Sequence, residues 1–480
     1  MIKVYSTNQI RDAERKAIDG GVSEDELIER ASKKLCEEVL NVKGNNVAIF
    51  AGGGNNGSDA LSLALLLRDL RNVTVYTCSN HRNIYNENRL KKINSFGAIV
   101  RPMEECDLSD TDVVIDGIFG IGLTRNIEGE LKTVIEKINE SKAYVIAVDV
   151  PSGLNADTGK VMGVAVEADK TVTFSGIKQG LIISHGRNYS GEIVVADIGF
   201  EASEADSEIV EAEDIKLPKR KTVSHKGNYG NVKIIAGSPT MIGASILAHE
   251  SALSALRSGA GYATLCVPES LISVYQTRIK EELLFIMPDI VGKITYNERI
   301  LDEIMTKTSS IVIGMGLGKN SDIIKIISYL AKNFDGTLVI DGDGLNALSE
   351  NISAINDHKA KIILTPHAGE FIRLYGDYDK PDVEAVKEFS KKIGGVVAMK
   401  SATTIICDGE KIYLNTTGSP AMAKAGSGDV LAGMIGAFSA TVDPLTATLR
   451  GCFAFGKAGE RAEKIRGSYS VLASDIISEI

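Results

Sequence analysis

Short runs of apolar residues alternate with stretches of helical periodicity along most of the chain. In the first half, the runs that predict buried strands lie at 47–50, 73–78, 98–100, 113–116, 144–150, 172–174 and 193–198. Helical spacing precedes and separates these runs at 8–40, 60–70, 86–96 and 130–139, and Ser23 with Glu26 matches a capping box. Because strands alternate with helices, the pattern predicts a mostly parallel sheet covered by helices on both faces.

The alternation stops between residues 201 and 231. Acidic residues dominate 201–214, and the basic run 219–221 follows Pro218. We interpret this stretch as a solvated connector, since so short a basic run is a weak signal of nucleic-acid binding. A chain of 480 residues is too long for one ordinary core, so we predict two domains, residues 1–211 and 212–480.

The α/β pattern starts again in the second half. Apolar runs at 232–236, 262–267, 310–314, 337–341, 361–365 and 395–400 predict parallel strands, and residues 244–258 predict a helix. Asp408-Gly409 stands between the runs 404–407 and 411–415, which is a strong signal of a hairpin. The fold class is therefore α/β, and the two halves show too little similarity to share one fold.

Composition narrows the classes of function. The net charge of −10 and the aromatic content of 5% disfavour an electropositive surface or a stacking platform for nucleic acid. The six cysteines form no CxxC pair, which disfavours a zinc ribbon and is typical of a reducing compartment. Residues 1–6 lack a signal-peptide pattern and no long apolar run occurs, so we expect a cytoplasmic protein with no membrane span.

A glycine-rich segment, residues 52–59, joins the first predicted strand to the next helix. It contains G-x-G-x-x-G, a pattern that lets the backbone approach a phosphate at a helix N-terminus. The acidic residue expected after the second strand is missing, because Thr77-Cys78-Ser79-Asn80 stands there, so the NAD fingerprint is half met. A tight turn with Asn and Asp as cap residues remains the alternative.

Two further strand ends carry polar groups. Asp116 is followed by a glycine-rich stretch, and Asp149 is followed by Val-Pro-Ser-Gly. In open α/β sheets, ligands bind at the carboxyl ends of the strands. Asn56, Asp116 and Ser152 offer hard oxygen ligands, which suit an alkali or alkaline-earth cation better than zinc.

At these residues, roughly positions 1–210 resemble the NAD(P)H-hydrate epimerase family, which implies a Rossmann-like parallel sheet sandwich. The resemblance implies that a potassium ion is held by Asn56, Asp116 and Ser152. It implies that the hydrated cofactor, NADHX or NADPHX, is contacted by Asn55, Asn56, Gly57, Ser58, Asp59, Gly120, Ile121, Gly122, Leu123, Thr124, Arg125, Asn126 and Asp149. The family usually reads Asn-Asn-Gly-Gly-Asp-Gly, so Ser58 is expected to add a side chain near the phosphate.

Epimerisation of a carbinolamine carbon beside a ring nitrogen requires proton delivery and removal. Asp149 is the predicted acid/base, because a strand-end carboxylate facing a ligand can have a shifted pKa. Lys178 is the second candidate for this role or a partner of Asp149, and the alternative is that it is a surface lysine.

A second glycine turn, residues 426–429, runs into an apolar helix near the C-terminus. Its free amides and the helix start favour an oxyanion, and Asp429 stands beside them to take a proton from a substrate hydroxyl. An anion hole with a base and magnesium suits phosphoryl transfer to an alcohol. The absence of a Walker A sequence excludes a P-loop ATPase, and a plain glycine-rich N-cap is the alternative interpretation.

Residues 212–480 resemble the ribokinase-like superfamily, in the branch of ADP- or ATP-dependent NAD(P)H-hydrate dehydratases, which implies an α/β/α domain. The motifs that carry the resemblance lie at 226–230, 258–261, 314–318, 341–346, 365–370 and 426–429. It implies nucleotide binding by Lys400, Ser401, Ala402, Thr403, Thr404, Gly426, Ser427 and Gly428. It also implies contacts to the hydrated cofactor by Ala260, Gly318, His367 and Asp429, although His367 is alternatively a helix cap.

Together the two halves predict a bifunctional repair enzyme. One half interconverts the (R)- and (S)-epimers of the hydrated cofactor. The other phosphorylates the ring hydroxyl of the (S)-epimer so that phosphate leaves, giving NADH or NADPH, AMP and phosphate. The resemblance favours ADP with Mg²⁺, while the residues leave ATP open, and we expect a homo-oligomer.

Two alternatives remain open. In the first, the chain would be a small-alcohol kinase, for instance for a vitamin precursor, with a ligand-sensing N-terminal domain. In the second, its N-terminal half would be a partner-binding module without catalysis. The carboxylates of Asp116 and Asp149 favour catalysis over the binding module, which needs no acid/base.

Overall fold

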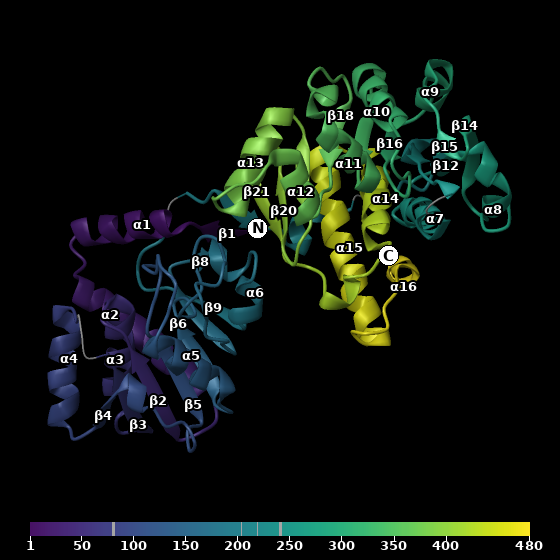
Figure 1. Cartoon of the computed structure of the whole chain (residues 1–480). Helices are drawn as coiled ribbons and strands as arrows, with labels where there is room; N and C mark the ends of the chain where they lie inside the picture. Colours follow the sequence, from purple (N-terminus) through teal and green to yellow (C-terminus); the bar gives the residue numbers. More distant parts are fainter. Residues whose placement is uncertain (79–81, 203, 218, 240–241) are drawn as a thin grey trace. The chain divides into compact units, whose positions relative to one another are not determined.

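The computed structural model describes residues 1–78, 82–202, 204–217, 219–239 and 242–480. Ser79 and Asn80 of the predicted second strand end and Pro218 of the predicted connector lie outside these residues. The described chain forms two compact units, one of residues 3–207 and one of residues 208–480 with Met1 and Ile2. In Figure 1 the first unit runs from purple to blue and the second from teal to yellow.

Seven parallel strands form the sheet of the N-terminal unit. In spatial order they are β4 (Ile99–Pro102), β3 (Asn72–Thr77), β2 (Asn46–Ala51), β5 (Val113–Gly117), β6 (Tyr144–Val148), β7 (Lys170–Phe174) and β9 (Glu192–Ala196). The direction of progression along the sheet reverses between β2 and β5. Such a reversal point is where open α/β sheets bind ligands at the carboxyl ends of the strands.

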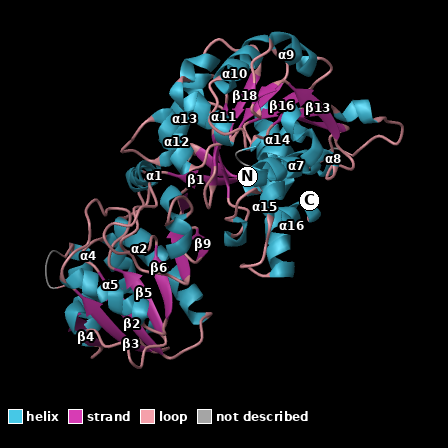
Figure 2. Cartoon of the chain, turned by 45° about the vertical axis from the view of Figure 1, so that its right-hand side comes forward, coloured by secondary structure: helices cyan, strands magenta, loops and turns pink. Residues whose placement is uncertain are grey.

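Helices cover both faces of this sheet, as predicted. They are α1 (Thr7–Asp19), α2 (Glu24–Leu40), α3 (Asn55–Leu67), α4 (Ile84–Ser95), α5 (Glu130–Glu140) and the short α6 (Gly186–Tyr189). Alternate residues of β2 point to opposite faces, so Ile49 packs in the core with α2, α3 and α4, and Phe50 packs in the core with α5. The predicted parallel sandwich is confirmed (Figure 2).

Two local expectations were wrong in detail. The helix after the first glycine segment begins at Asn55 rather than at residue 60, with Gly54 as its N-cap, because its first polar turn carries no apolar periodicity. Ser23 accepts a hydrogen bond from the Glu26 amide, but the Glu26 carboxylate pairs with Arg30 at 2.6 Å instead of closing a capping box.

Three short strands escaped the sequence pattern: β1 (Ile2–Tyr5), β8 (Ile177–Lys178) and β10 (Ser207–Ile209). β1 pairs in parallel with β8, with Val4 opposite Ile177. β8 and β10 have two and three residues, which are too few positions to show an apolar run or period-two alternation.

The sheet of the C-terminal unit is mixed. Its strands lie in the order β13 (Leu283–Met287), β12 (Tyr262–Pro268), β11 (Asn231–Ile235), β16 (Ser310–Ile313), β17 (Thr337–Ile340), β18 (Lys361–Leu364), β19 (Val396–Met399), β20 (Thr404–Cys407) and β21 (Ile412–Asn415). The strands from β13 to β19 are parallel, and β20 and β21 form the predicted antiparallel hairpin. The edge strand β13 and the small pair β14 (Asp289–Ile290) and β15 (Lys293–Ile294) were not predicted.

Helices also line the C-terminal sheet. They are α7 (Ile242–Arg257), α8 (Ile272–Gln276), α9 (Glu298–Met305), α10 (Asp322–Asn333), α11 (Gly342–Glu350), α12 (Ala368–Tyr375), α13 (Asp382–Ile393), α14 (Ser427–Ser439), α15 (Pro444–Arg466) and α16 (Ala473–Ser478). Val312 and Val339 pack with α7, α14 and α15, while their buried neighbours Ile313 and Ile340 point to the opposite face. None of the helices in the described part of the chain combines the length and the hydrophobicity that a membrane span requires.

Candidate active sites

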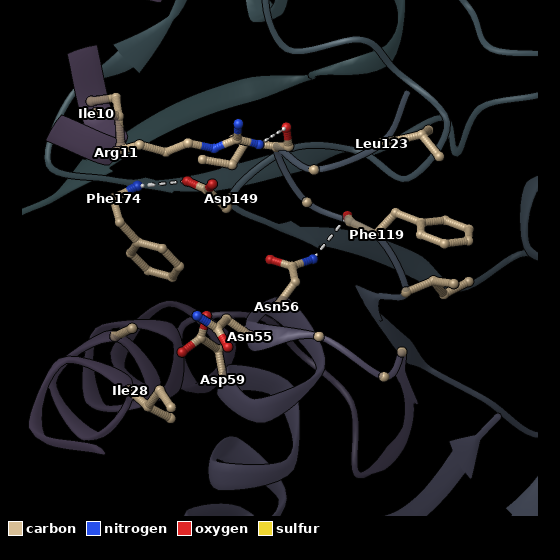
Figure 3. Close-up of a pocket in the computed structure, with 18 of the residues that line it drawn as sticks. Ile10, Arg11, Ile28, Asn55, Asn56, Asp59, Phe119, Leu123, Asp149 and Phe174 are labelled. Atoms are coloured by element: carbon tan, nitrogen blue, oxygen red, sulfur yellow. Dashed lines mark hydrogen bonds between the residues drawn. The ribbon is translucent and has the colours of Figure 1, made fainter. Parts of the chain in front are cut away.

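A cavity of about 770 Å³ opens in the N-terminal unit beside the carboxyl ends of β2, β5 and β6 (Figure 3). Helices α1 and α2 and the loops after these strands form its walls. The predicted residues that line it are Asn55, Asn56, Asp59, Gly120, Ile121, Gly122, Leu123, Arg125, Asp149 and Lys178. Thr124 and Asn126 are exposed on the same loop as Arg125, outside the lining.

Asp149 follows β6 with a φ of 63°, a left-handed conformation that is uncommon for a residue with a side chain. Its Oδ1 accepts hydrogen bonds from Thr173 Oγ1 and the Phe174 amide, both at 3.1 Å, and forms an ion pair with Lys178. Within the described part of the chain no bond uses Asp149 Oδ2, so this oxygen is available to a ligand in the cavity.

Lys178 is buried, with 1% of its side chain exposed, so the surface-lysine interpretation was wrong. Besides the ion pair, its Nζ donates to Thr173 Oγ1 at 3.0 Å and to the Phe174 carbonyl at 2.7 Å. Strand β8 places this lysine under Asp149. A buried ammonium with these partners holds the Asp149 carboxylate in one orientation.

The three candidate cation ligands gather around the main chain of Phe119. Ser152 donates to Asp116 through its amide at 2.7 Å and its hydroxyl at 2.5 Å, and it accepts from the Phe119 amide at 2.8 Å. Asn56 donates to the Phe119 carbonyl at 2.9 Å. Asp116 is fully buried, and this burial raises its pKa to about 6 although the Ser152 bonds oppose the shift.

Asp116 meets no cationic side chain within the described residues, so a bound cation is the group that would compensate its charge. The surrounding oxygens are one carboxylate, one hydroxyl, one carbonyl and one amide. Among all the residues that the structure describes, no three His, Cys, Asp or Glu side chains lie close enough together to hold a metal ion. A site with one carboxylate fits a monovalent cation better than zinc.

The side chain of Ser58 lies against α4 and not in the cavity. Its hydroxyl donates to Asn86 Oδ1 at 2.6 Å, and the residue is fully buried. This placement differs from the expectation of a side chain near the phosphate. Gly57 also lies behind the cavity wall, where an added Cβ would stand 2.0 Å from the Gly52 carbonyl oxygen, so this glycine is required by backbone packing.

Sequence reasoning missed Glu14, which lines the cavity from α1. Burial and the nearby Asp149 raise the pKa of the Glu14 carboxyl. A signal was present, because Glu14 follows the buried Ile10 by four positions and therefore lies on the same face of the helix.

In the C-terminal unit, three polar side chains meet at neighbouring strand ends. Asp341 follows β17, Thr365 follows β18 and Lys400 follows β19. Asp341 Oδ1 forms an ion pair with Lys400 at 2.6 Å and accepts from Thr365 Oγ1 at 2.9 Å. A Cβ added to Gly428 would lie 3.3 Å from Lys400 Nζ, so the second glycine turn packs directly against this pair.

Gly426, with a φ of 89°, is the N-cap of α14, and Asp429 lies in the first turn of that helix. The first-turn amides of a helix have no partner within it, so Gly428 and Asp429 present N–H groups to an anion. Burial and the neighbouring Asp341 raise the pKa of Asp429 to about 7, while Lys400 opposes the shift. A carboxyl that titrates near neutrality is well matched to accept a proton.

Two further candidate residues of this unit, His367 and Gly318, form hydrogen bonds within the protein. The capping interpretation of His367 is confirmed, because its Nδ1 accepts from the amides of Gly369 at 3.0 Å and Glu370 at 3.3 Å. Its side chain is 56% exposed. The Gly318 amide donates to Asp343 Oδ2 at 2.8 Å.

The remaining predicted contacts differ in exposure. Ser401 and Ala402 are exposed between β19 and β20, whereas Thr403 is fully buried and its carbonyl accepts from Ser401 Oγ at 2.6 Å. Ala260 and Thr404 are half-buried. The buried members of this group contribute to the loop structure, and the exposed ones are accessible to a nucleotide.

Comparison with known proteins covers both units. A family model described as NAD(P)H-hydrate dehydratase matches residues 232–480, and one described as YjeF-related protein N-terminus matches residues 24–180. The bifunctional NAD(P)H-hydrate repair enzyme of Thermofilum pendens is 36% identical over 494 residues, covering 97% of this chain and 93% of that protein. This chain belongs to the family of bifunctional NAD(P)H-hydrate repair enzymes.

Other members match this repair-enzyme chain over its whole length. The one from Coxiella burnetii is 33% identical, covering 100% of this chain and 99% of that protein. A solved ADP/ATP-dependent NAD(P)H-hydrate dehydratase from Bacillus subtilis, co-crystallised with ATP and Mg²⁺, is 26% identical with a TM-score of 0.46, covering 56% of this chain and 94% of that one. The two family models and the full-length relatives confirm the resemblance drawn from the motifs at the level of the family.

Proposed function

We propose that residues 1–211 interconvert the (R)- and (S)-epimers of hydrated NADH and NADPH. Residues 212–480, with a ribokinase-like arrangement, then dehydrate the (S)-epimer at the expense of ADP. One observation carries the proposal: in each unit, a glycine turn that opens a helix lies near a carboxyl group. This group is Asp149 in the N-terminal unit and Asp429 in the C-terminal unit, in a chain that belongs to this family. In this arrangement a nucleotide phosphate and a proton acceptor lie side by side.

In the N-terminal unit, Asp149 handles the proton of the ring hydroxyl. Its Oδ1 is held by Lys178 and the Phe174 amide, which leaves Oδ2 directed to substrate. Asn55 and the loop 120–126 hold the nucleotide. Asn56, Asp116 and Ser152, with the Phe119 carbonyl, would hold K⁺, whose positive charge offsets Asp116 and attracts the pyrophosphate.

In the C-terminal unit, Asp429 takes the proton of the substrate hydroxyl, and the Gly428 and Asp429 amides stabilise the transferring phosphoryl group. Lys400 and the residues that follow bind the nucleotide. Phosphate then leaves the ring carbon, expelled by the lone pair of the ring nitrogen, which forms a C=N⁺ bond. Loss of a proton from the neighbouring ring carbon to solvent gives the C=C bond of NADH or NADPH and returns the lone pair to nitrogen, with AMP and phosphate as the other products. Mg²⁺ would bind the phosphates with oxygen donors such as Asp341 and Asp343, and it neutralises their charge.

The test uses separated (R)- and (S)-NADHX with the full chain, ADP, Mg²⁺ and K⁺, followed by the near-ultraviolet absorbance of NADH. We expect both epimers to be converted completely. Asp149→Ala should leave (S)-NADHX conversion intact and reduce (R)-NADHX conversion to the spontaneous rate. Asp429→Asn should stop dehydration of both epimers.

Two results contradict the proposal. A stable phosphorylated alcohol without NADH supports the small-alcohol kinase instead. Equal conversion of (R)-NADHX by the wild type and Asp149→Ala removes the epimerase assignment.

A further inference from the structure

The epimerase cavity contains a second carboxyl group opposite Asp149. Asp59 extends from α3 on one wall, and Asp149 lies on the facing wall, with the Asn56 side chain between the two levels (Figure 3). Epimerisation of a carbinolamine exchanges the hydroxyl between the two faces of one carbon. A cavity with one proton-handling group on each side therefore matches the geometry of the reaction.

Asp59 is 8% exposed, and in the described part of the chain its carboxyl forms no hydrogen bond or ion pair. The charged groups that face it are Asp149 after β6, Glu14 on α1, Lys178 on β8 and Arg89 on α4. Both cations have other partners. Lys178 pairs with Asp149.

Arg89 is likewise engaged away from Asp59. It pairs with Asp25 at 2.8 Å and donates to Ser62. Burial, followed by the charge of Asp149, therefore raises the pKa of Asp59 well above its usual value. The two carboxyls differ in environment, one charge-paired and one not, which is the pattern that separates a base from an acid.

We propose that Asp59 is the general acid that acts across the cavity from Asp149, an assignment that rests on the proposed epimerase function and deepens it. Asp59 gives its proton to the departing hydroxyl, so the C–O bond breaks and water leaves. The ring nitrogen lone pair forms a C=N⁺ bond. Water then adds to the opposite face of that carbon, its proton goes to Asp149, and the nitrogen regains its lone pair.

The proposed reaction conserves atoms, protons and electrons. One water leaves and one water enters, no electrons are transferred to a second compound, and the proton lost by Asp59 is replaced when Asp149 releases the one it gained. The reverse epimerisation uses the two residues in exchanged roles.

The test measures interconversion of (R)- and (S)-NADHX by the full chain with K⁺ and without ADP. Asp59→Asn keeps the shape and a hydrogen-bond donor but has no acidic proton, so we expect kcat to fall about 100- to 10,000-fold with KM nearly unchanged. Asp59→Glu keeps an acidic proton and should recover part of kcat. In the wild type, kcat should decline as rising pH ionises Asp59, whose pKa is raised by burial, and the residual activity of Asp59→Asn should lack this decline.

The second unit provides an internal control for folding. Dehydration of (S)-NADHX with ADP by the same Asp59→Asn sample should equal that of the wild type. If the wild type does not interconvert the epimers, the proposed function itself is wrong. If the wild type does and Asp59→Asn is equally fast, or if Glu14→Gln alone causes the loss, Asp59 is not the acid.

Discussion

Lys178 and Asp149 form an ion pair in which the lysine side chain is 1% exposed and the aspartate side chain 13%. The lysine comes from the two-residue strand β8 and the aspartate from the end of β6. The Lys178 ammonium has almost no contact with water that could replace this partner. The pair therefore links the folding of the N-terminal unit to the orientation of its candidate acid/base.

Lys178→Met should destabilise this unit by about 3–5 kcal/mol, because removal of one partner leaves a buried charge uncompensated. Urea unfolding measures this change, and the rate of (R)-NADHX conversion should fall with it while (S)-NADHX dehydration persists. Lys142→Met, at an exposed lysine, is the control and should stay within about 0.5 kcal/mol of the wild type. Wild-type stability of Lys178→Met would show that the pair contributes nothing.

Ser58→Gly removes the hydroxyl that contacts α4. Because the Ser58 hydroxyl donates to Asn86 and lies outside the cavity, we expect a loss of about 1–3 kcal/mol in unfolding free energy and an unchanged KM for (R)-NADHX. Thermal unfolding and steady-state kinetics on one sample separate the two effects. A change in KM without a change in stability contradicts the structural role.

The dehydration rate should rise with pH and reach half its plateau near pH 7. The pKa of Asp429 is raised to about 7, so the carboxyl is protonated and unable to accept the substrate proton below this pH. At one pH unit below the pKa, the rate should be about one tenth of the plateau. The measurement is kcat at saturating ADP and (S)-NADHX between mildly acidic and mildly alkaline pH.

Asp357→Asn, at an exposed aspartate, provides the control for this profile and should keep the wild-type curve. Asp429→Asn should lose about 100- to 10,000-fold in kcat at every pH. A wild-type rate that is independent of pH across this interval rules out Asp429 as the base.

Potassium should stabilise the N-terminal unit through Asp116. Replacing Na⁺ by K⁺ should raise the unfolding temperature of the wild type, because a ligand that binds only the folded state stabilises it. Asp116→Asn removes the buried charge and should abolish this K⁺-dependent shift, whereas the exposed Asp110→Asn should retain it. An equal shift in Asp116→Asn would place the cation elsewhere.

The order of strands and helices and the two glycine turns were predictable, because both depend on local periods and on backbone conformations that few residues adopt. Asp116, Asp149 and Asp429 stood out as candidates for the same reason, since they lie at the end of a strand, directly after a strand and directly after a glycine turn. The start of α3 at Asn55 was missed because a polar helical turn has no apolar period.

The sequence by itself determined the α/β class, the family and the strand-end carboxylates. Each of these follows from a short-range pattern that can be recognised within one segment, without knowing how distant segments pack. Only the tertiary structure decided that Lys178 is buried beneath Asp149, that Ser58 turns to α4, and that Asp59 faces the cavity without a partner. Burial and charge pairing depend on which distant segments pack together, and that information lies in no single stretch of residues.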